Sequence, residues 1–382
     1  MANSCDAIII GAGPAGLATA AALRARGLNA AILEKSDAVG AVWRRHYDRL
    51  HLHTDRARSG LPGLPIPKAY GRYPSRAQVI EYLEAYAAKF ALKPVFNAQV
   101  RGMRRDGPAW RAEAGENSQT APIVVVATGL ADYPCSPNWP GMESFVGPVL
   151  HSSVYRNSAP FSGKHVLVIG YGNSGAEIAL DLAEAGVDVA LSVRSPVNVI
   201  PRELFGLPIL AWGLTGRLFP SPVADMINAP LLRFATGSIE KLGLKRSPKG
   251  PLQSIEEDRR VPLIDVGTLD AIRDRRIKLR GDISSFTSEG VEFQQSSAER
   301  FDAIILATGF RPDLRALLPD AKDVLDATGA PLVSGRATAE PGLFFCGAIP
   351  SALGQLRQIG IEATRIATVA ASATRPSLRR PP

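Results

Sequence analysis

Two glycine-rich turns constrain the fold of this 382-residue chain more than any other feature. The first reads Gly-Ala-Gly-Pro-Ala-Gly at residues 11–16, and the second reads Gly-Tyr-Gly-Asn-Ser-Gly at residues 170–175. Each turn follows a short apolar run and precedes a segment of helical character that a glycine closes, and another apolar run comes next. A strand–turn–helix–strand unit that occurs twice predicts two dinucleotide-binding domains.

In the first unit the three glycines have separate tasks. Gly11 permits the tight turn, Gly13 lets the backbone approach a pyrophosphate, and Gly16 lets helix and strand pack closely. Glu34 ends the second strand, where a carboxylate binds a ribose hydroxyl and repels a 2′-phosphate. The site therefore suits FAD or NAD, and its N-terminal position favours FAD by analogy with flavoproteins that bind two dinucleotides.

In the second unit the corresponding strand ends at Arg194, followed by Ser195, and no acid occupies that position. A guanidinium can pair with the 2′-phosphate of NADPH through two parallel hydrogen bonds. The second unit therefore predicts an NADPH site.

Two further apolar runs end alike, in Ala-Thr-Gly at residues 127–129 and 307–309, so each unit has its own closing strand. The predicted fold class is α/β, with two Rossmann-like domains and the NADPH domain inserted into the FAD domain. We expect residues 1–157 and 297–382 to form the FAD-binding domain. Residues 158–296 then form the NADPH-binding domain, with a helical insert at 204–260. The apolar stretch 204–244 could be a packing element, a lid or a contact with a membrane surface.

Composition narrows the function further. The chain is 46% hydrophobic and 21% charged with a net charge of +8, as expected of a globular protein. The chain has no run of five basic residues, which would suggest nucleic-acid binding. It also has no stretch of eighteen apolar residues, which would suggest a membrane span. The three cysteines lack metal or redox spacing, so no metal site is expected. A cytoplasmic enzyme with no integral membrane association is predicted, and its oligomeric state stays open.

Residues 145–155 fit F-x-G-x-x-x-H-x-x-x-Y, which resembles the signature of class B flavin-containing monooxygenases. Other segments resemble the YUCCA branch of that family, and the resemblance covers nearly the whole chain. They are residues 47–53, 82–87, 93–97, 172–175, 265–268 and 301–309. The resemblance implies that NADPH reduces FAD, that O2 then forms a flavin C4a-(hydro)peroxide, and that one oxygen atom passes to a small hydrophobic organic substrate.

Several reactions stay open at this point. They are YUCCA-like oxidative decarboxylation of an α-keto acid, oxygenation of nitrogen or sulfur, and Baeyer–Villiger insertion. Tyr155 stands where the usual Baeyer–Villiger enzymes have tryptophan, which disfavours the third. A flavin reductase or oxidase without oxygenation is a further alternative, whereas a disulfide reductase would need a cysteine pair that is missing.

The resemblance also assigns residues. His53 is the expected catalytic side chain beside the flavin, and His151 and Tyr155 are expected to brace the joint between the domains. The expected cofactor-binding residues near FAD are Gly11, Gly13, Pro14, Ala15, Gly16, Glu34, Lys35, Gly40, Trp43, His53, Val100, Thr128, Gly129, Gly347 and Leu356. Those expected near NADPH are Gly170, Gly172, Asn173, Ser174, Gly175, Arg194, Ser195, Thr308 and Gly309.

Overall fold

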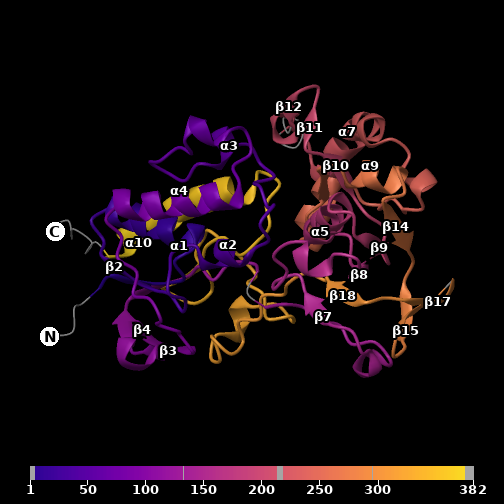
Figure 1. The fold of residues 1–382 in the computed structure, drawn as a ribbon. Coiled ribbons are helices and arrows are strands. Elements are labelled where there is room, and N and C mark those ends of the chain that lie inside the picture. Colours follow the sequence, from indigo (N-terminus) through magenta and orange to yellow (C-terminus); the bar gives the residue numbers. More distant parts are fainter. Residues whose placement is uncertain (1–4, 132, 213–217, 295, 375–382) are drawn as a thin grey trace, which may run out of the picture.

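The computed structural model describes residues 5–131, 133–212, 218–294 and 296–374, which form two lobes side by side (Figure 1). The first lobe carries the described parts nearest both termini, and the second is built from the middle of the chain. Each lobe has a parallel sheet at its centre, helices on one face and a small antiparallel sheet on the other.

The first lobe is organised around a four-stranded parallel sheet in the order β19-β6-β1-β2. Its central strands β1 and β6 are buried throughout, as expected for strands covered on both faces. Helices α1, α4 and α10 share one core with Ile9 and Val125, whereas Ile8 and Val124 face the antiparallel sheet β3-β4-β5. The strands are β1 (Ala7–Ile10), β2 (Ala30–Leu33), β3 (Gly102–Asp106), β4 (Ala109–Glu113), β5 (Gln119–Ala121), β6 (Ile123–Val126) and β19 (Leu343–Phe345). The helices are α1 (Pro14–Arg24), α2 (Ala41–Arg45), α3 (Arg56–Ser59), α4 (Arg76–Lys89) and α10 (Gln355–Thr374).

The second lobe repeats this plan with a five-stranded parallel sheet in the order β14-β9-β8-β18-β7. Helices α5 and α9 cover one face, and the antiparallel sheet β15-β16-β17 packs against the other through Phe286 and Phe293. The strands are β7 (Val149–His151), β8 (His165–Ile169), β9 (Asp188–Ser192), β14 (Ile277–Arg280), β15 (Ile283–Phe286), β16 (Gly290–Phe293), β17 (Ser296–Arg300) and β18 (Ala303–Leu306). The helices are α5 (Asn173–Glu184) and α9 (Thr268–Arg273). Because β6 precedes this lobe and β19 follows it, the predicted fold class is confirmed, with the second domain inserted into the first.

The second sheet extends beyond the limits 158–296 that the sequence suggested. Strand β18 pairs with β8 on one side and with β7 on the other, so β7 and β18 both belong to the second lobe. The limits expected from the sequence place residues 149–151 and 303–306 in the first domain, and the strand pairing corrects this. The second domain extends past these limits because β18 completes the parallel sheet beside β8. Strand β7, at the edge of the same sheet, precedes the second glycine turn in the chain.

The chain passes between the lobes twice, and the two crossings are paired. The amide of Cys135 donates to the carbonyl of Gly309 at 2.9 Å, and the amide of Arg311 donates to the carbonyl of Tyr133 at 2.9 Å. Pro134 and Phe310 form an antiparallel bridge between these two bonds. The two crossings therefore run as a short two-stranded ladder.

The described part of the segment 204–260 contains two helices and two 3₁₀ turns, and a small hairpin lies at its start. Two-residue strands β11 (Glu203–Leu204) and β12 (Leu207–Pro208) pair antiparallel, and the 3₁₀ turn η5 (Ile209–Trp212) follows. Helix α7 (Ser221–Thr236), the 3₁₀ turn η6 (Ile239–Leu242) and helix α8 (Pro251–Asp258) come next. Strands β10 (Val199–Pro201) and β13 (Leu263–Asp265) pair in parallel at the base of the insert. Residues 213–217 lie outside the described part of the chain.

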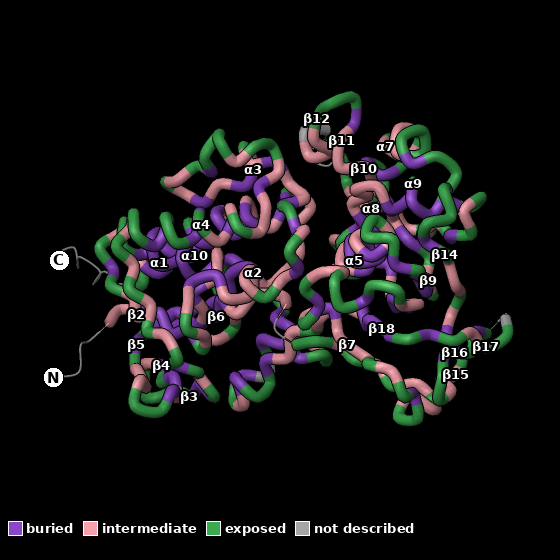
Figure 2. Tube along the Cα trace, in the orientation of Figure 1, coloured by how far each residue is buried: buried purple, intermediate pink, exposed green. Residues whose placement is uncertain are grey.

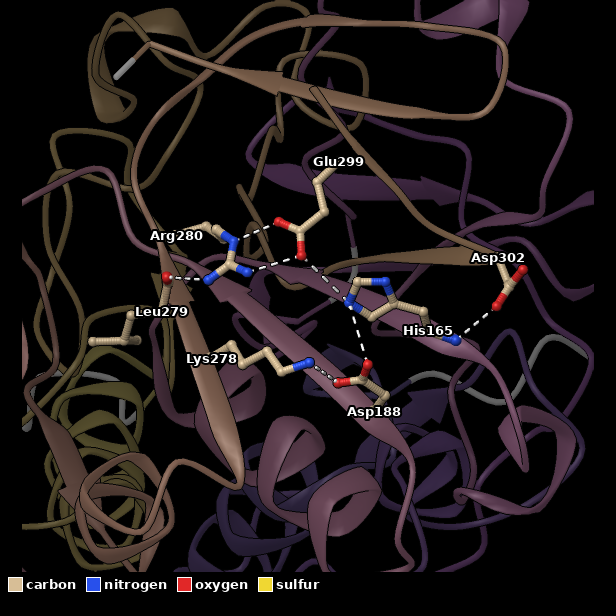
Figure 3. Close-up of polar contacts among 7 residues, drawn as sticks. All are labelled: His165, Asp188, Lys278, Leu279, Arg280, Glu299 and Asp302. Carbon is tan, nitrogen blue, oxygen red and sulfur yellow. Dashed lines mark hydrogen bonds and ion pairs between the residues drawn. The ribbon is translucent and has the colours of Figure 1, made fainter. Parts of the chain in front are cut away.

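Charged side chains connect the parallel sheet of the second lobe to strand β17 of its antiparallel sheet (Figure 3). Arg280 donates to both carboxylate oxygens of Glu299, and Lys278 pairs with Asp188 at 2.7 Å. His165 lies between the two acids, 3.6 Å from Glu299 and 3.9 Å from Asp188. These contacts connect β8, β9, β14 and β17.

Candidate active site

The first glycine turn has the geometry that a phosphate site requires. Gly11 has a φ of +108°, and a Cβ there would lie 2.7 Å from the carbonyl oxygen of Ala127. A Cβ on Gly16 would lie 1.9 Å from the carbonyl oxygen of Gly11, so helix α1 can approach β1 only with glycine at this position. A Cβ on Gly13 would meet nothing within 4 Å, which leaves open space in front of the backbone.

A cavity of about 460 Å³ lies in front of this turn. The carboxylate of Glu34 accepts hydrogen bonds from the amides of Ala12 at 2.6 Å and Ser36 at 2.9 Å, so its position is fixed at the cavity wall. The predicted residues that line the cavity are Gly11, Gly13, Pro14, Ala15, Glu34, Lys35, Gly40, Trp43, Val100, Thr128, Gly129 and Gly347. This volume, with room for a pyrophosphate beside an N-terminal helix end, fits FAD.

Three predicted residues lie elsewhere. Gly16 packs behind the turn, and His53 and Leu356 line a neighbouring apolar cavity in place of this one. Conversely, Arg45 and His46 line the cavity although the sequence did not single them out. Burial and the nearby Arg156 and Arg45 lower the pKa of His46 from 6.5 to about 4, so the ring is neutral at pH 7.

The second glycine turn has nearly the same backbone geometry as the first. Gly170 also has a φ of +108°, with a Cβ 2.5 Å from the carbonyl oxygen of Ala307, and a Cβ on Gly175 would lie 1.9 Å from the carbonyl oxygen of Gly170. A Cβ on Gly172 would again meet nothing within 4 Å. Two domains of one chain therefore offer the same phosphate-sized opening at a helix N-terminus.

A second cavity, of about 430 Å³, lies in front of this turn. The predicted residues that line it are Gly170, Gly172, Arg194, Ser195, Thr308 and Gly309. Arg260 and Arg311 also line it, and the sequence did not single them out because both come from distant loops. The guanidinium groups fit the phosphates of NADPH.

Asn173, Ser174 and Gly175 lie behind this turn and outside the cavity lining. The Asn173 amide holds strand β13, because its nitrogen donates to the carbonyl of Pro262 and its oxygen accepts from the amide of Ile264. These residues shape the turn from behind.

A third cavity, of about 450 Å³, lies between the lobes and is mostly apolar. It shares Pro14, Trp43 and Gln355 with the first cavity and Pro262 with the second, so it adjoins both. Its apolar wall comes from the insert and from the start of α10. The insert residues are Ile209, Leu210, Leu231, Leu232, Leu252 and Ile255. The arrangement places an apolar ligand beside both dinucleotide sites.

His53 connects the lobes at the edge of this third cavity. Its Nε2 contacts the carboxylate of Glu177, which lies on helix α5 and is only 4% exposed. A carboxylate can only accept a hydrogen bond, so Nε2 of His53 carries the ring hydrogen and donates the bond. Nδ1 is then the acceptor nitrogen of the ring. The Tyr47 hydroxyl also hydrogen-bonds Glu177 and Ser174, and burial raises its pKa well above the usual value. Glu177 thus joins two side chains of the first lobe to helix α5, and no sequence pattern marks these contacts.

The segment 145–155 belongs to the second lobe, where residues 149–151 form β7 and the Phe145 ring packs beside Phe286. The Tyr155 hydroxyl donates to Asp181 at 2.5 Å, and its ring stacks on Phe161. The Nε2 of His151 lies 3.1 Å from the carbonyl oxygen of Gly309, at the second crossing. Both Tyr155 and His151 thus contact groups of the protein scaffold, and neither side chain lines one of the three cavities.

The three cysteines are unpaired, and Cys346 is buried, which raises the pKa of its thiol to about 12. A thiol of this kind stays protonated and unreactive at neutral pH. Cys346 therefore offers no thiol chemistry.

Comparison with known proteins agrees with this geometry. A family model described as pyridine nucleotide-disulphide oxidoreductase matches residues 8–201. The indole-3-pyruvate monooxygenase YUCCA1 of Oryza sativa subsp. japonica is 42% identical over 329 residues, covering 85% of this chain and 81% of that protein. The probable indole-3-pyruvate monooxygenase YUCCA4 of Arabidopsis thaliana is 39% identical over 311 residues, covering 80% of this chain and 76% of that protein. The chain belongs to the YUCCA-like branch of the class B flavin monooxygenases.

Solved structures support the assignment of this YUCCA-like monooxygenase. The flavin-containing monooxygenase from Stenotrophomonas maltophilia superposes with a TM-score of 0.75 at 26% identity, covering 98% of this chain and all of that one. An open form of cyclohexanone monooxygenase has a TM-score of 0.77 at 20% identity, covering 98% and 88% of the two chains, and shares the fold. The protein is therefore an FAD- and NADPH-dependent monooxygenase that acts on a small organic substrate with O2, as its sequence predicts. None of the helices in the described part of the chain has the length and apolar character needed to cross a bilayer.

Proposed function

We propose that this YUCCA-like monooxygenase oxidatively decarboxylates an aromatic 2-oxo acid such as indole-3-pyruvate in the cytoplasm. The observation that carries the proposal is the apolar cavity of about 450 Å³ that adjoins both dinucleotide cavities. This is the size of a site for one small aromatic molecule. The relatives at 42% and 39% identity are named for indole-3-pyruvate.

The 2-oxo acid, O2, NADPH and one proton give a carboxylic acid one carbon shorter, CO2, NADP⁺ and water. The bond between the keto carbon and the carboxylate breaks, one oxygen atom of O2 enters the new carboxylate, and the other leaves as water. NADPH supplies the two electrons.

We assign the first cavity to FAD and the second to NADPH. At the first, the open backbone at Gly13 and the N-terminus of α1 suit the pyrophosphate, and Glu34 suits the adenosine ribose. At the second, Gly172 suits the pyrophosphate, and Arg194 with Ser195 suits the 2′-phosphate.

FAD, when bound, accepts hydride from NADPH and activates O2. The protein's own residues hold and shield the reacting groups. Trp43 lies on the boundary of the flavin and substrate cavities, where its ring excludes water. His53 lines the substrate cavity with Nε2 committed to Glu177, so Nδ1 is the ring nitrogen left to accept a hydrogen bond there. His46, held neutral by burial, adds no charge beside the flavin cavity.

The test uses the FAD-loaded enzyme with NADPH, 18O2 and indole-3-pyruvate labelled with 13C in the carboxylate. We expect indole-3-acetate with one 18O atom, and 13CO2 released in the same amount as NADPH consumed. Hydrogen peroxide in place of labelled acid would refute oxygenation of this substrate. A parallel assay with amines and thioethers reports N- or S-oxygenation, and their preferential oxygenation would overturn the 2-oxo acid proposal.

A further inference from the structure

Helix α7 exposes apolar side chains where a surface helix of a water-soluble domain has polar ones. Val223, Met226, Ile227 and Phe234 are all exposed, Met226 at 69% and Phe234 at 75%. Their spacing places them on one face of the helix. This face carries Arg233 as its charged residue.

The β11–β12 hairpin and the start of the helical segment extend this apolar surface. Phe205 and Leu207 at the hairpin tip are exposed, and the Phe205 and Phe234 rings lie 6.5 Å apart. Leu218 and Phe219 are exposed just before α7. We call these eight side chains the apolar patch: Phe205, Leu207, Leu218, Phe219, Val223, Met226, Ile227 and Phe234. The patch lies on one end of the second lobe, where Figure 1 shows β11, β12 and α7 together.

The patch is a concentration of exposed apolar surface and not a scatter. It holds eight of the sixteen large hydrophobic side chains that are exposed among the described residues. Clusters of this kind mark sites of contact with another apolar body. Helix α7 is exposed or intermediate along most of its length, with Ala224, Asp225 and Thr236 buried (Figure 2).

The opposite face of α7 is already in use, so the patch does not wait to fold onto the protein itself. Leu231 and Leu232 line the substrate cavity, and the buried Asp225 accepts hydrogen bonds from the amides of Leu252 and Gln253 at the start of α8. Asp225 thereby fixes α7 to α8 by capping the next helix. The helix is anchored on one side and apolar on the other.

Basic side chains follow the patch closely along the chain. Arg233 lies next to Phe234, and Lys241 and Lys245 follow the end of α7; all three are exposed. No ion pair among the described residues involves them, whereas the nearby Glu240 is paired with Arg246 at 3.1 Å. The excess of unpaired positive charge favours an anionic partner. It disfavours a symmetric contact with a second copy, which would bring like charges together.

We propose that the apolar patch docks this enzyme peripherally on an anionic lipid bilayer, with Arg233, Lys241 and Lys245 against the lipid phosphates. Aromatic and aliphatic side chains enter the boundary of headgroups and acyl chains, and basic residues add attraction to anionic lipid. The same helix that lies on the bilayer forms a wall of the substrate cavity. The proposal is independent of which substrate the enzyme uses.

The test is co-sedimentation of the FAD-loaded full chain with sucrose-loaded vesicles of phosphatidylcholine alone or with 30% phosphatidylserine. We expect binding to the anionic vesicles that weakens with salt. In Met226→Ser/Phe234→Ser, affinity for these vesicles should fall about 100-fold, because two large side chains lose their apolar burial. Neither side chain lines the substrate cavity, so turnover in solution should stay unchanged.

The matched control is Val146→Ser/Leu332→Ser, which removes two exposed apolar side chains outside the patch and should bind like the unaltered enzyme. Arg233→Glu/Lys241→Glu should remove the preference for anionic vesicles. Flavin content and melting temperature verify that each variant is folded. Absence of binding to either vesicle would overturn the proposal. So would equal loss in patch and control variants, or a dimer in sedimentation velocity that Met226→Ser/Phe234→Ser converts to monomer.

Discussion

The contact between His53 and Glu177 is the sharpest point at which to perturb the site. The Glu177 side chain is 5% exposed and that of His53 is 20% exposed, so the carboxylate depends on its protein donors. Leaving a buried charge without its partner costs ~3–5 kcal/mol. Since His53 retains some contact with solvent, we expect the low end, about 3 kcal/mol of unfolding free energy, for His53→Ala. Glu177→Gln keeps a side-chain acceptor and should cost about 1 kcal/mol.

In the double variant the carboxylate is gone, so removing His53 is no longer penalised by an unpaired charge. The double-mutant cycle should therefore show a coupling energy of about 2 kcal/mol. The assay is urea unfolding at one fixed FAD concentration, because bound cofactor stabilises the folded state. In turnover, both single variants should bind FAD but release part of the NADPH electrons as hydrogen peroxide.

Glu184→Gln is the matched control, because it removes a carboxylate from the same helix whose partner, Arg49, lies 2.7 Å away at the surface. It should cost less than about 1 kcal/mol and leave product yield per NADPH unchanged. A coupling energy near zero between His53 and Glu177 would show that the contact does not hold the lobes together. Full product yield in Glu177→Gln would show that Glu177 does not position His53.

Three further perturbations test other parts of the site. Arg194→Ala should raise KM about 10- to 100-fold for NADPH and little for NADH, whereas the exposed control Arg300→Ala should change neither; equal loss for both nucleotides would refute the assignment. Gly172→Ala should retain the fold and the flavin content but lose NADPH affinity, measured by titration. Gly175→Ala should lower the melting temperature, because its Cβ overlaps backbone. A lower melting temperature for Gly172→Ala than for Gly175→Ala would contradict the geometry. The pKa of His46 is lowered from 6.5 to about 4, so the unfolded chain binds the proton first and stability falls as pH drops between these values. The loss amounts to at most about 3 kcal/mol of unfolding free energy. In urea unfolding of the flavin-free protein, His46→Asn should flatten this pH dependence.

The sequence predicts the two dinucleotide domains because their determinants are local. The turns at Gly11 and Gly170, their helices and the acid or base at the strand end all lie within one supersecondary unit. Such units fold on information carried by a few adjacent residues, and the insertion of one domain in the other follows from their order.

The remaining features depend on long-range contact. The pairing of His53 with Glu177 joins residues 124 positions apart, and no local pattern marks it. Strand β7 has three residues, too few for a pattern to show, so its place in the second sheet was not foreseen. Arg260 and Arg311 reach the second cavity from loops whose course depends on packing.

The laddered pair of crossings has a consequence for how this protein can be re-engineered. Residues 133–135 and 309–311 lie side by side as hydrogen-bonded strands, so the intervening segment starts and ends at neighbouring points, about 5 Å apart. A tight turn spans that gap. The second lobe is thus a removable cassette: a nicotinamide module of different preference can be transplanted here without rerouting the strands of the first lobe.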